Sequence, residues 1–467
     1  MPRCVRSLGL LVMTIGLAAL PADAKPNLVL LFADDAGYGD FGFHGSQHFK
    51  TPHLDRLAES GVVLSNFYVS APVCGPSRAG LITGRYQQRF GFLENNVPRV
   101  MSASSKLLGD DMGLPTDLPT MGDRLQGLGY RTAIFGKWHL GNADRYHPTR
   151  RGFDEFYGFR GGARSFYPLA DPDRGPAENR MERGFGEYRE HEGYLTNALA
   201  DEACDFIERH AERPFFAYVA FNAVHTPMEA DPQDADAFPH LKGVRRTAAQ
   251  MTLSLDRACG QIVAKLEELG LRENTLVVFT NDNGGPSDRN GSSNHPLSGV
   301  KDTHREGGVR VPCIVSWPGV LPAGAKGESP MSTLDLLPTF YSAGGGDVSA
   351  LEGADGVDLM PFLLGKNTGR PHETLYWKKE ARAAIRDGDW KLIRYLDRPA
   401  ELFDLSDDPG EQNDLAATNR DRVKQLYSKL FAWEVGLQRP LFQLELSTEK
   451  WSAERLDAYS EPPPASY

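Results

Sequence analysis

The sequence predicts an α/β fold with a large, mostly parallel sheet sandwiched by helices, followed by a smaller C-terminal α+β domain built on an antiparallel sheet. Through most of the chain, short apolar runs alternate with helical patterns, which is typical of parallel sheets. These runs are continuously apolar, as strands covered on both faces must be. After residues 365–371 the strands become shorter and alternate apolar with polar residues, so a second domain is expected there.

Each element follows from its own pattern. Four buried strands are predicted in the large sheet, at 27–33 (NLVLLFA), 131–136 (RTAIFG), 214–221 (PFFAYVAF) and 275–280 (TLVVFT). The segments between them predict helices over 51–60, 120–128, 196–211 and 248–269. The second domain is predicted to hold strands in TLYWKK, in ARAAIRDGDWKLIRYL with a turn at Asp387-Gly388, and in AELFDL, then a helix near 420–433. The predicted boundary separates residues 25–368 from a C-terminal subdomain and tail, residues 369–467.

Composition and charge limit the classes of function. The chain has 467 residues, of which 40% are hydrophobic and 24% charged, and this ordinary globular composition excludes fibrous and disordered classes. The formal net charge of −11 argues against nucleic acid as a partner. An anionic substrate would have to be held by local lysines and arginines against the overall field.

The first 24 residues have the pattern of a cleaved signal peptide. Arg3 and Arg6 precede an apolar run over 8–20, which ends at the small residues Ala22-Asp23-Ala24. The run is too short to span a membrane, and no later stretch approaches about 18 uninterrupted apolar residues. We therefore expect a periplasmic or secreted protein with no stable membrane insertion after cleavage.

Four cysteines remain after cleavage, Cys74, Cys204, Cys259 and Cys313. Four would permit two disulfides in an oxidising compartment. Cys204 and Cys259, however, lie in apolar helical patterns and are interpreted as small buried hydrophobic residues. No disulfide framework is predicted.

Oxygen-bearing side chains follow two of the predicted strands. Asp34 and Asp35 come directly after 27–33, and Asp282 and Asn283 come after 275–280. Ligands bind beyond the carboxyl ends of strands in open α/β sheets, so these four side chains can converge into an all-oxygen site for Ca²⁺ or Mg²⁺. Taken singly, either pair is explained as caps of the following turns; their shared position at strand ends favours a metal site.

Basic residues follow the other strands. Lys137 and His139 lie on one face after 131–136, and His225 comes before a Thr-Pro turn after 214–221. Lys301 lies in the Gly-rich stretch SGVKDTHREGGVRVP. Taken alone, His225 has a structural interpretation and the Lys301 stretch that of a solvated basic loop.

Cys74, in the stretch VSAPVCGPSRAGLITGR, is predicted to lie just outside a helix N-terminus, since Pro76 suits the first helical position. Unpaired amides and the helix dipole favour negative charge there, and Arg78 adds a cation one turn into the helix. Such a setting activates a cysteine, or an oxygen nucleophile derived from it. The alternative is a buried structural cysteine in a turn.

The stretch CGPSRAGLITGR resembles the signature of the type I, formylglycine-dependent sulfatases of the alkaline phosphatase-like superfamily. The resemblance extends through NLVLLFADDAGYGDFGFHGS, GYRTAIFGKWHLG, FTNDNGG, GVKDTHREGGVRVP and ELFDLSDDPGEQNDLA, and it is nearest to the arylsulfatase and glycosaminoglycan-sulfatase branch. It implies that residues 25–368 are the catalytic domain. It also implies that a formylglycine-generating or anaerobic sulfatase-maturing enzyme oxidises Cys74 to 3-oxoalanine (formylglycine).

The resemblance also implies a role for each candidate residue. One Ca²⁺ per chain would be held by Asp34, Asp35, Asp282 and Asn283 and would also contact residue 74. Lys137 and Lys301 match the sulfate-binding lysines, and His225 matches the acid that protonates the leaving alcohol. His139 matches the partner of residue 74, and Arg78 the group that steadies it.

The implied activity is removal of sulfate from a sulfated carbohydrate (a polysaccharide or glycosaminoglycan) or from an aryl sulfate. Loops 90–114 and 160–189 are expected to supply the pocket of the leaving group. His44 and the Arg, Tyr and Phe residues of the second loop are candidates for a sugar subsite, the alternative being ordinary surface. Two alternatives remain open at this point. One is a phosphonate or phosphate-ester hydrolase of the same superfamily, and the other is a non-catalytic carbohydrate-binding relative.

Overall fold

The computed structural model describes residues 25–171 and 176–461. The predicted signal peptide, residues 1–24, lies outside the described residues. A large mixed sheet has the strand order β11-β2-β10-β9-β1-β8-β4-β5-β6-β7. Its strands are β1 (Asn27–Ala33), β2 (Val62–Leu64), β4 (Arg131–Lys137), β5 (Glu155–Phe159), β6 (Glu182–Arg183), β7 (Glu187–Tyr188), β8 (Phe215–Ala220), β9 (Thr275–Asn281), β10 (Ile314–Ser316) and β11 (Ala325–Gly327).

The centre of this sheet is parallel, and its two margins are mixed. The strands β9, β1, β8, β4 and β5 pair in parallel, whereas β10 and β6 each join the sheet antiparallel. All four predicted strands are present, and every residue of β1, β8 and β9 is buried. Burial on both faces explains why these strands are continuously apolar rather than alternating.

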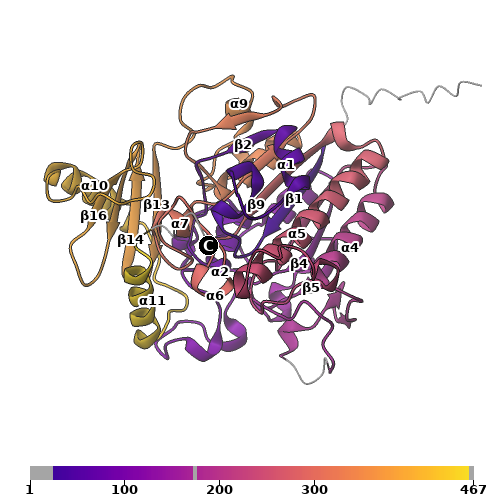
Figure 1. Cartoon of the computed structure of the whole chain (residues 1–467), viewed down its shortest axis with the longest axis horizontal. Coiled ribbons are helices and arrows are strands. Elements are labelled where there is room, and N and C mark those ends of the chain that lie inside the picture. Colours follow the sequence, from indigo (N-terminus) through magenta and orange to yellow (C-terminus); the bar gives the residue numbers. More distant parts are fainter. Residues whose placement is uncertain (1–24, 172–175, 462–467) are drawn as a thin grey trace, which may run out of the picture.

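Helices cover both faces of the sheet, and Figure 1 shows α4 and α5 side by side across one face. Residues on one side of β1, such as Val29 and Leu31, pack in one core with α1 (Pro52–Glu59), α4 (Leu195–Arg209) and α5 (Gly243–Glu268). Those on the other side, such as Leu28 and Leu30, pack in a second core with α2 (Cys74–Thr83), α3 (Met121–Gly127) and α8 (Leu336–Ala343). The predicted architecture is therefore confirmed.

The C-terminal sheet is antiparallel, as predicted, with the order β13-β14-β15-β16. Its strands are β13 (Thr374–Lys379), β14 (Arg382–Asp387), β15 (Trp390–Arg394) and β16 (Glu401–Asp404), and α10 (Arg420–Glu434) packs on it. Leu375 and Trp377 of β13 belong to the same core as α2 and α8, so this sheet is joined to the main body by apolar packing. The division at residue 368 stays a prediction.

Several helices differ from the sequence prediction, including α8, which was not predicted. The helix predicted over 248–269 is α5, which begins earlier, at Gly243. Residues 243–247 are exposed or half-buried and carry no apolar periodicity, so the sequence pattern did not reveal them. The helix α11 (Leu446–Ala458) was not predicted at all. In Figure 1 it lies below the strands of the C-terminal sheet, and its Arg455 pairs with Asp288 of the short helix α6 (Ser287–Asn290).

The remaining elements are short. The strands β3 (Phe67–Tyr68) and β12 (Met331–Ser332) form a separate pair, and α7 (Glu306–Val309) and α9 (Met360–Leu363) lie in connections. Across residues 25–171 and 176–461, no helix combines the length and apolar character needed to cross a membrane.

Candidate functional site

Four adjacent strands deliver polar side chains to one edge of the large sheet. Asp34 follows β1, Lys137 ends β4, and Asp282 follows β9, while His225 lies five residues beyond the end of β8. In the sheet order these strands are neighbours, β9-β1-β8-β4, and they run parallel. Their carboxyl ends therefore meet at the same edge, where ligands bind in open α/β sheets.

Asp35 is held in an unusual backbone conformation at this edge. Its φ of 60° lies in the left-handed region, which is costly for a residue with a side chain. Two contacts hold it there: its N–H donates to Oδ1 of Asp282 over 3.3 Å, and Nδ2 of Asn290 donates to its carbonyl oxygen over 2.8 Å. The buried carboxylate of Asp35 is thereby turned toward Lys301 and His225.

Cys74 is the first residue of α2 rather than the residue before the helix, and it is buried with 1% of its surface exposed. Its sulfur lies 3.0 Å from Nζ of Lys301 and 3.6 Å from Oδ1 of Asp34. Burial and the nearby carboxylate of Asp282 raise the pKa of the Cys74 thiol, but Lys137 and Lys301 outweigh them, so the net pKa is below its ordinary value. The site favours an anion at position 74.

Arg78 lies one turn into α2 and is fully buried beneath the site. Its guanidinium donates through Nε and Nη2 to one carboxylate oxygen of Asp282, over 3.1 and 2.9 Å, and through Nη1 to the carbonyl oxygen of Lys137 over 3.1 Å. Burial and the carboxylate of Asp34 raise the pKa of Asp282 to about 6 even though Arg78 opposes the rise. Arg78 thus ties α2 to two of the central strands.

Each of the two lysines is paired with one aspartate. Nζ of Lys137 lies 2.5 Å from Oδ2 of Asp34, and Nζ of Lys301 lies 2.6 Å from Oδ1 of Asp35. Burial lowers the pKa of Lys301, but Asp35 and Cys74 outweigh it and raise the pKa above its ordinary value. Burial likewise raises the pKa of Asp35, yet Lys301 and His225 hold it below its usual range. Lys301 and Asp35 are therefore both charged.

The ring of His225 faces an acceptor with each of its nitrogens. Nδ1 is 2.7 Å from the carbonyl oxygen of Thr226, and Nε2 is 3.5 Å from Oδ2 of Asp35. Burial lowers the pKa of His225, but Asp35 and Asp34 reverse the effect and raise it above its ordinary value of 6.5. An imidazolium, which donates from both nitrogens, would satisfy both of these acceptors.

His139 lies nearby, and its pKa is shifted in the opposite direction to that of His225. Its backbone N–H donates to the carbonyl oxygen of Arg160 over 3.0 Å, and a Cβ at Gly162 would come within 2.5 Å of its Nε2, so the ring packs directly on the 160–162 backbone. Burial, then Lys137 and Arg78, hold the pKa of His139 well below 6.5. Its Nδ1 is buried and has no hydrogen-bond partner among the described residues.

The donor set at this edge fits a hard cation. Ligand atoms of Asp34, Asp35, Cys74 and His225 all lie within 4.8 Å of one another. Asn283 donates through Nδ2 to Oδ1 of Asp35 over 2.7 Å, but its buried Oδ1 has no hydrogen-bond partner among the described residues. A buried, unpaired amide oxygen beside three carboxylates is the environment that Ca²⁺ or Mg²⁺ would satisfy.

A cavity of about 230 Å³ opens beside Asp35, His225 and Lys301. The loop 90–114 contributes to its wall, as expected, through Glu94, Asn95, Val97 and Val100. The loop 160–189 and His44 contribute no lining residue within the described chain, so that part stays a prediction. Arg160 is instead turned to Glu182 and Asp144, over 2.8 Å each, and stabilises its own loop.

Other lining residues were missed by the sequence interpretation. Lys379 at the end of β13 reaches the cavity and pairs with Glu94 over 2.6 Å and with Asp302 over 2.8 Å. Burial raises the pKa of Glu94 to about 8, with Lys379 opposing the rise. The remaining missed residues come from α6, α11 and the segment before α11: Arg289, Leu444, Thr448, Trp451 and Arg455. No local pattern distinguishes them from surface residues.

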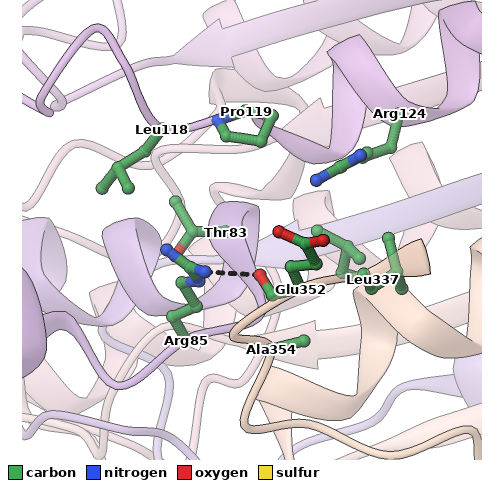
Figure 2. A pocket seen from close by; sticks show the side chains of 9 residues that line it. Thr83, Arg85, Leu118, Pro119, Arg124, Leu337, Glu352 and Ala354 are labelled. Atoms are coloured by element: carbon green, nitrogen blue, oxygen red, sulfur yellow. Dashed lines mark hydrogen bonds between the residues drawn. The ribbon is translucent and has the colours of Figure 1, made fainter. Parts of the chain in front are cut away.

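Figure 2 shows a separate cavity, in which Arg85 donates a hydrogen bond to the backbone carbonyl of Glu352 while Leu118 and Pro119 lie on the opposite side. Its volume of about 20 Å³ is enough for about one water molecule. Of these two cavities, only the one beside Asp35, His225 and Lys301 is large enough to hold a sugar.

Comparison with known proteins gives two family matches. Residues 26–346 match the Sulfatase family, and residues 301–435 match the family described as N-sulphoglucosamine sulphohydrolase, C-terminal. The N-acetylgalactosamine-6-sulfatase of Canis lupus familiaris is 35% identical over 407 residues, which cover 82% of this chain and 74% of that protein.

Solved structures agree with these matches. Ps i-CgsB in complex with k-i-k-neocarrahexaose is 35% identical, with a TM-score of 0.83 over 93% of this chain and 98% of that one. The phosphonate monoester hydrolase SpPMH of Silicibacter pomeroyi shares the fold, with a TM-score of 0.64 at 20% identity over 89% of this chain and 96% of that one. Since the family model matches most of the sequence and a named relative aligns over four-fifths of it, the chain is an enzyme of the sulfatase family, within the alkaline phosphatase-like superfamily.

Proposed function

We propose that this sulfatase removes sulfate from a sulfated carbohydrate, using 3-oxoalanine made from Cys74 and one bound Ca²⁺. The observation that carries the proposal is the position of Cys74, whose sulfur lies 3.0 Å from the Lys301 ammonium and 3.6 Å from the Asp34 carboxylate at the carboxyl edge of the sheet. A nucleophile, a cation for an anionic group and an acidic metal ligand thus meet at one point.

Asp34, Asp35, Asp282 and Asn283 are the residues that would hold the cation, together with residue 74. Three carboxylates and one amide oxygen match the hard-oxygen preference of Ca²⁺. When bound, the ion would polarise a sulfate oxygen and stabilise negative charge that develops during ester cleavage.

Conversion of Cys74 fits its surroundings. The residue begins α2, where the unpaired backbone amides favour an oxyanion, and Arg78 and Lys137 lie close beneath it. Hydrated 3-oxoalanine supplies two hydroxyls on one carbon, one to attack sulfur and the other to release sulfate later. The partner required before catalysis is a formylglycine-generating or anaerobic sulfatase-maturing enzyme.

The remaining residues have distinct tasks in this proposal. Lys137 and Lys301 present ammonium groups to the sulfate, each oriented by its aspartate. His225, whose pKa is raised above its ordinary value, donates a proton from Nε2 to the oxygen of the leaving alcohol. His139 stays neutral because of burial and neighbouring cations, so its unpaired Nδ1 is available to hydrogen-bond at residue 74.

A carbohydrate substrate is supported by the wall of the cavity. Its polar members include Glu94, Asn95, Thr226 and Thr448, which are able to hydrogen-bond sugar hydroxyls. The relatives point the same way, since one is named for an N-acetylgalactosamine sulfate and another was solved with a bound neocarrahexaose. A glycosaminoglycan or other polysaccharide met in the periplasm or outside the cell is therefore the proposed substrate.

The test is sulfate release by mature, desalted enzyme from defined sulfated oligosaccharides, with nitrophenyl sulfate and nitrophenyl phosphate mono- and diesters assayed in parallel. We expect sulfate release to exceed phosphoester turnover. Mass spectrometry of the tryptic peptide that contains residue 74 is expected to show the aldehyde in place of the thiol. Faster turnover of phosphoesters would favour the phosphonate and phosphate-ester alternative and contradict the proposal.

A further inference from the structure

The C-terminal segment 441–459 lies beyond both family-matched regions, which end at residues 346 and 435. It nevertheless supplies Leu444, Thr448, Trp451 and Arg455 to the wall of the cavity beside Cys74. The chemistry common to the family is carried by residues inside the matched regions. Residues of this segment are therefore in a position to contact the substrate and to affect substrate specificity.

The segment is attached to the catalytic loops at both ends. Before α11, the backbone N–H of Glu445 donates to the carbonyl of Val100 over 3.1 Å, and that of Ser102 donates to the carbonyl of Gln443 over 2.8 Å. Toward the end of α11, Arg455 donates through Nη1 to the carbonyl oxygen of Lys301 over 2.9 Å. The wall made by α11 is thus fixed relative to the lysine nearest Cys74.

The basic residues of the cavity differ in how they are compensated. Three of the four lysines and arginines have a carboxylate partner at 2.6 Å: Lys301 with Asp35, Lys379 with Glu94, and Arg455 with Asp288. The fourth, Arg289 of α6, is exposed and forms no ion pair with any side chain in the described part of the chain. Among the lysines and arginines that line this cavity, Arg289 is the one whose charge no described carboxylate offsets.

Arg289 is also positioned by an aromatic ring. Its guanidinium carbon lies 4.4 Å from the ring centroid of Trp451, and that of Arg455 lies 4.9 Å from the same ring. Stacking on the indole limits the directions in which Arg289 can point while leaving its in-plane N–H groups able to donate. A planar guanidinium of this kind binds sulfate or carboxylate through two parallel hydrogen bonds.

From these observations we infer that Arg289, positioned by Trp451, forms an anion subsite at the mouth of the cavity. It recognises a second sulfate, or a carboxylate, on the saccharide that carries the ester being cleaved. The inference rests on the proposed function and narrows it: the substrate is an oligosaccharide with at least two anionic groups. In a chain with a net charge of −11, such a ligand needs a local cation that is not already compensated.

The test compares two saccharides that share the same scissile sulfate and differ only in a second anionic group. For Arg289→Gln we expect kcat/KM on the doubly charged saccharide to fall about tenfold, mainly through KM, while kcat/KM on the singly charged one changes less than about twofold. For Trp451→Ala we also expect kcat/KM on the doubly charged saccharide to fall relative to kcat/KM on the singly charged one, but by a smaller factor. In the variant with both substitutions, the fold-loss in kcat/KM on the doubly charged saccharide should be smaller than the product of the two single fold-losses, because Trp451 acts through Arg289.

Arg422→Gln is the matched control, since Arg422 of α10 also lies over a tryptophan, 5.4 Å from the ring of Trp390 in the C-terminal sheet. In this variant, kcat/KM on the doubly charged saccharide divided by kcat/KM on the singly charged one should equal the wild-type value. Equal losses on both saccharides, or no loss in Arg289→Gln, would overturn the subsite. Wild-type turnover of nitrophenyl sulfate reports the sulfatase reaction separately, so failure of the subsite and failure of the proposed function give different results.

Discussion

The ammonium nitrogen of Lys301 lies 3.0 Å from the sulfur of Cys74, although 227 residues separate them in the chain. The same nitrogen lies 2.6 Å from Asp35, so one lysine joins the candidate nucleophile to the acidic cluster.

Replacing Cys74 with alanine is expected to reduce turnover of nitrophenyl sulfate by about 10³-fold or more, because the precursor of the nucleophile is lost. The loss of one buried sulfur should cost about 1 kcal/mol of unfolding free energy, so the melting temperature should change little. Cys259→Ala, which removes another buried free thiol, is the control and should retain activity. Activity retained in Cys74→Ala would refute the proposed nucleophile.

Lys301→Ala is expected to lower kcat/KM by about 10²- to 10³-fold, as when one preorganised charge-stabilising group is removed from an active site. Lys326→Ala, which removes an exposed lysine of β11, serves as the control. Steady-state kinetics on nitrophenyl sulfate measures both variants. Equal kinetics in the two would show that Lys301 does not contact the substrate.

Dialysis against a chelator is expected to lower activity and melting temperature together, and added Ca²⁺ should restore both, since a ligand that binds only the folded state stabilises it. Asn283→Ala removes the buried amide oxygen that has no described partner, so in this variant Ca²⁺ should raise the melting temperature less than in the wild type. Calorimetry with and without Ca²⁺ gives a readout independent of activity. Unchanged activity in metal-free protein would contradict the metal site.

A pH-dependent contribution to stability is expected from His372, whose Nε2 lies 2.6 Å from Oδ1 of Asp335. Burial lowers the pKa of His372, but Asp335, helped by Asp355, raises it above 6.5. Because the folded-state pKa is the higher one, the stabilisation is fully present below about pH 6.5 and is lost as the pH rises through the folded-state pKa. Each unit of difference is worth about 1.4 kcal/mol.

The variant that tests this pair is His372→Gln, with His240→Gln as the exposed control. We expect the difference in melting temperature between wild type and His372→Gln to be larger at pH 6 than at pH 9. A difference that stays constant with pH, or grows toward pH 9, would mean that the ion pair does not contribute as described.

Local patterns were sufficient to predict four strands at the centre of the large sheet and the polar residues that follow them. A strand buried on both faces must be apolar throughout, so β1, β8 and β9 are visible as continuous runs. The polar residues directly after β1 and β9 then lie at one edge because parallel strands end on the same side. The start of α5 was missed because its first turn faces solvent and has no apolar period.

The sequence by itself determined the sulfatase signature around Cys74, the α/β architecture and the aspartates that follow the strands, since each depends on residues close together in the chain. The tertiary structure alone decided how Asp35 and Lys301 pair, that Lys379 reaches Glu94, and that α11 forms a wall of the cavity. The physical reason is distance along the chain. Contacts such as Arg455 to Lys301, across 154 residues, depend on how separate elements pack, and no local spacing records that packing.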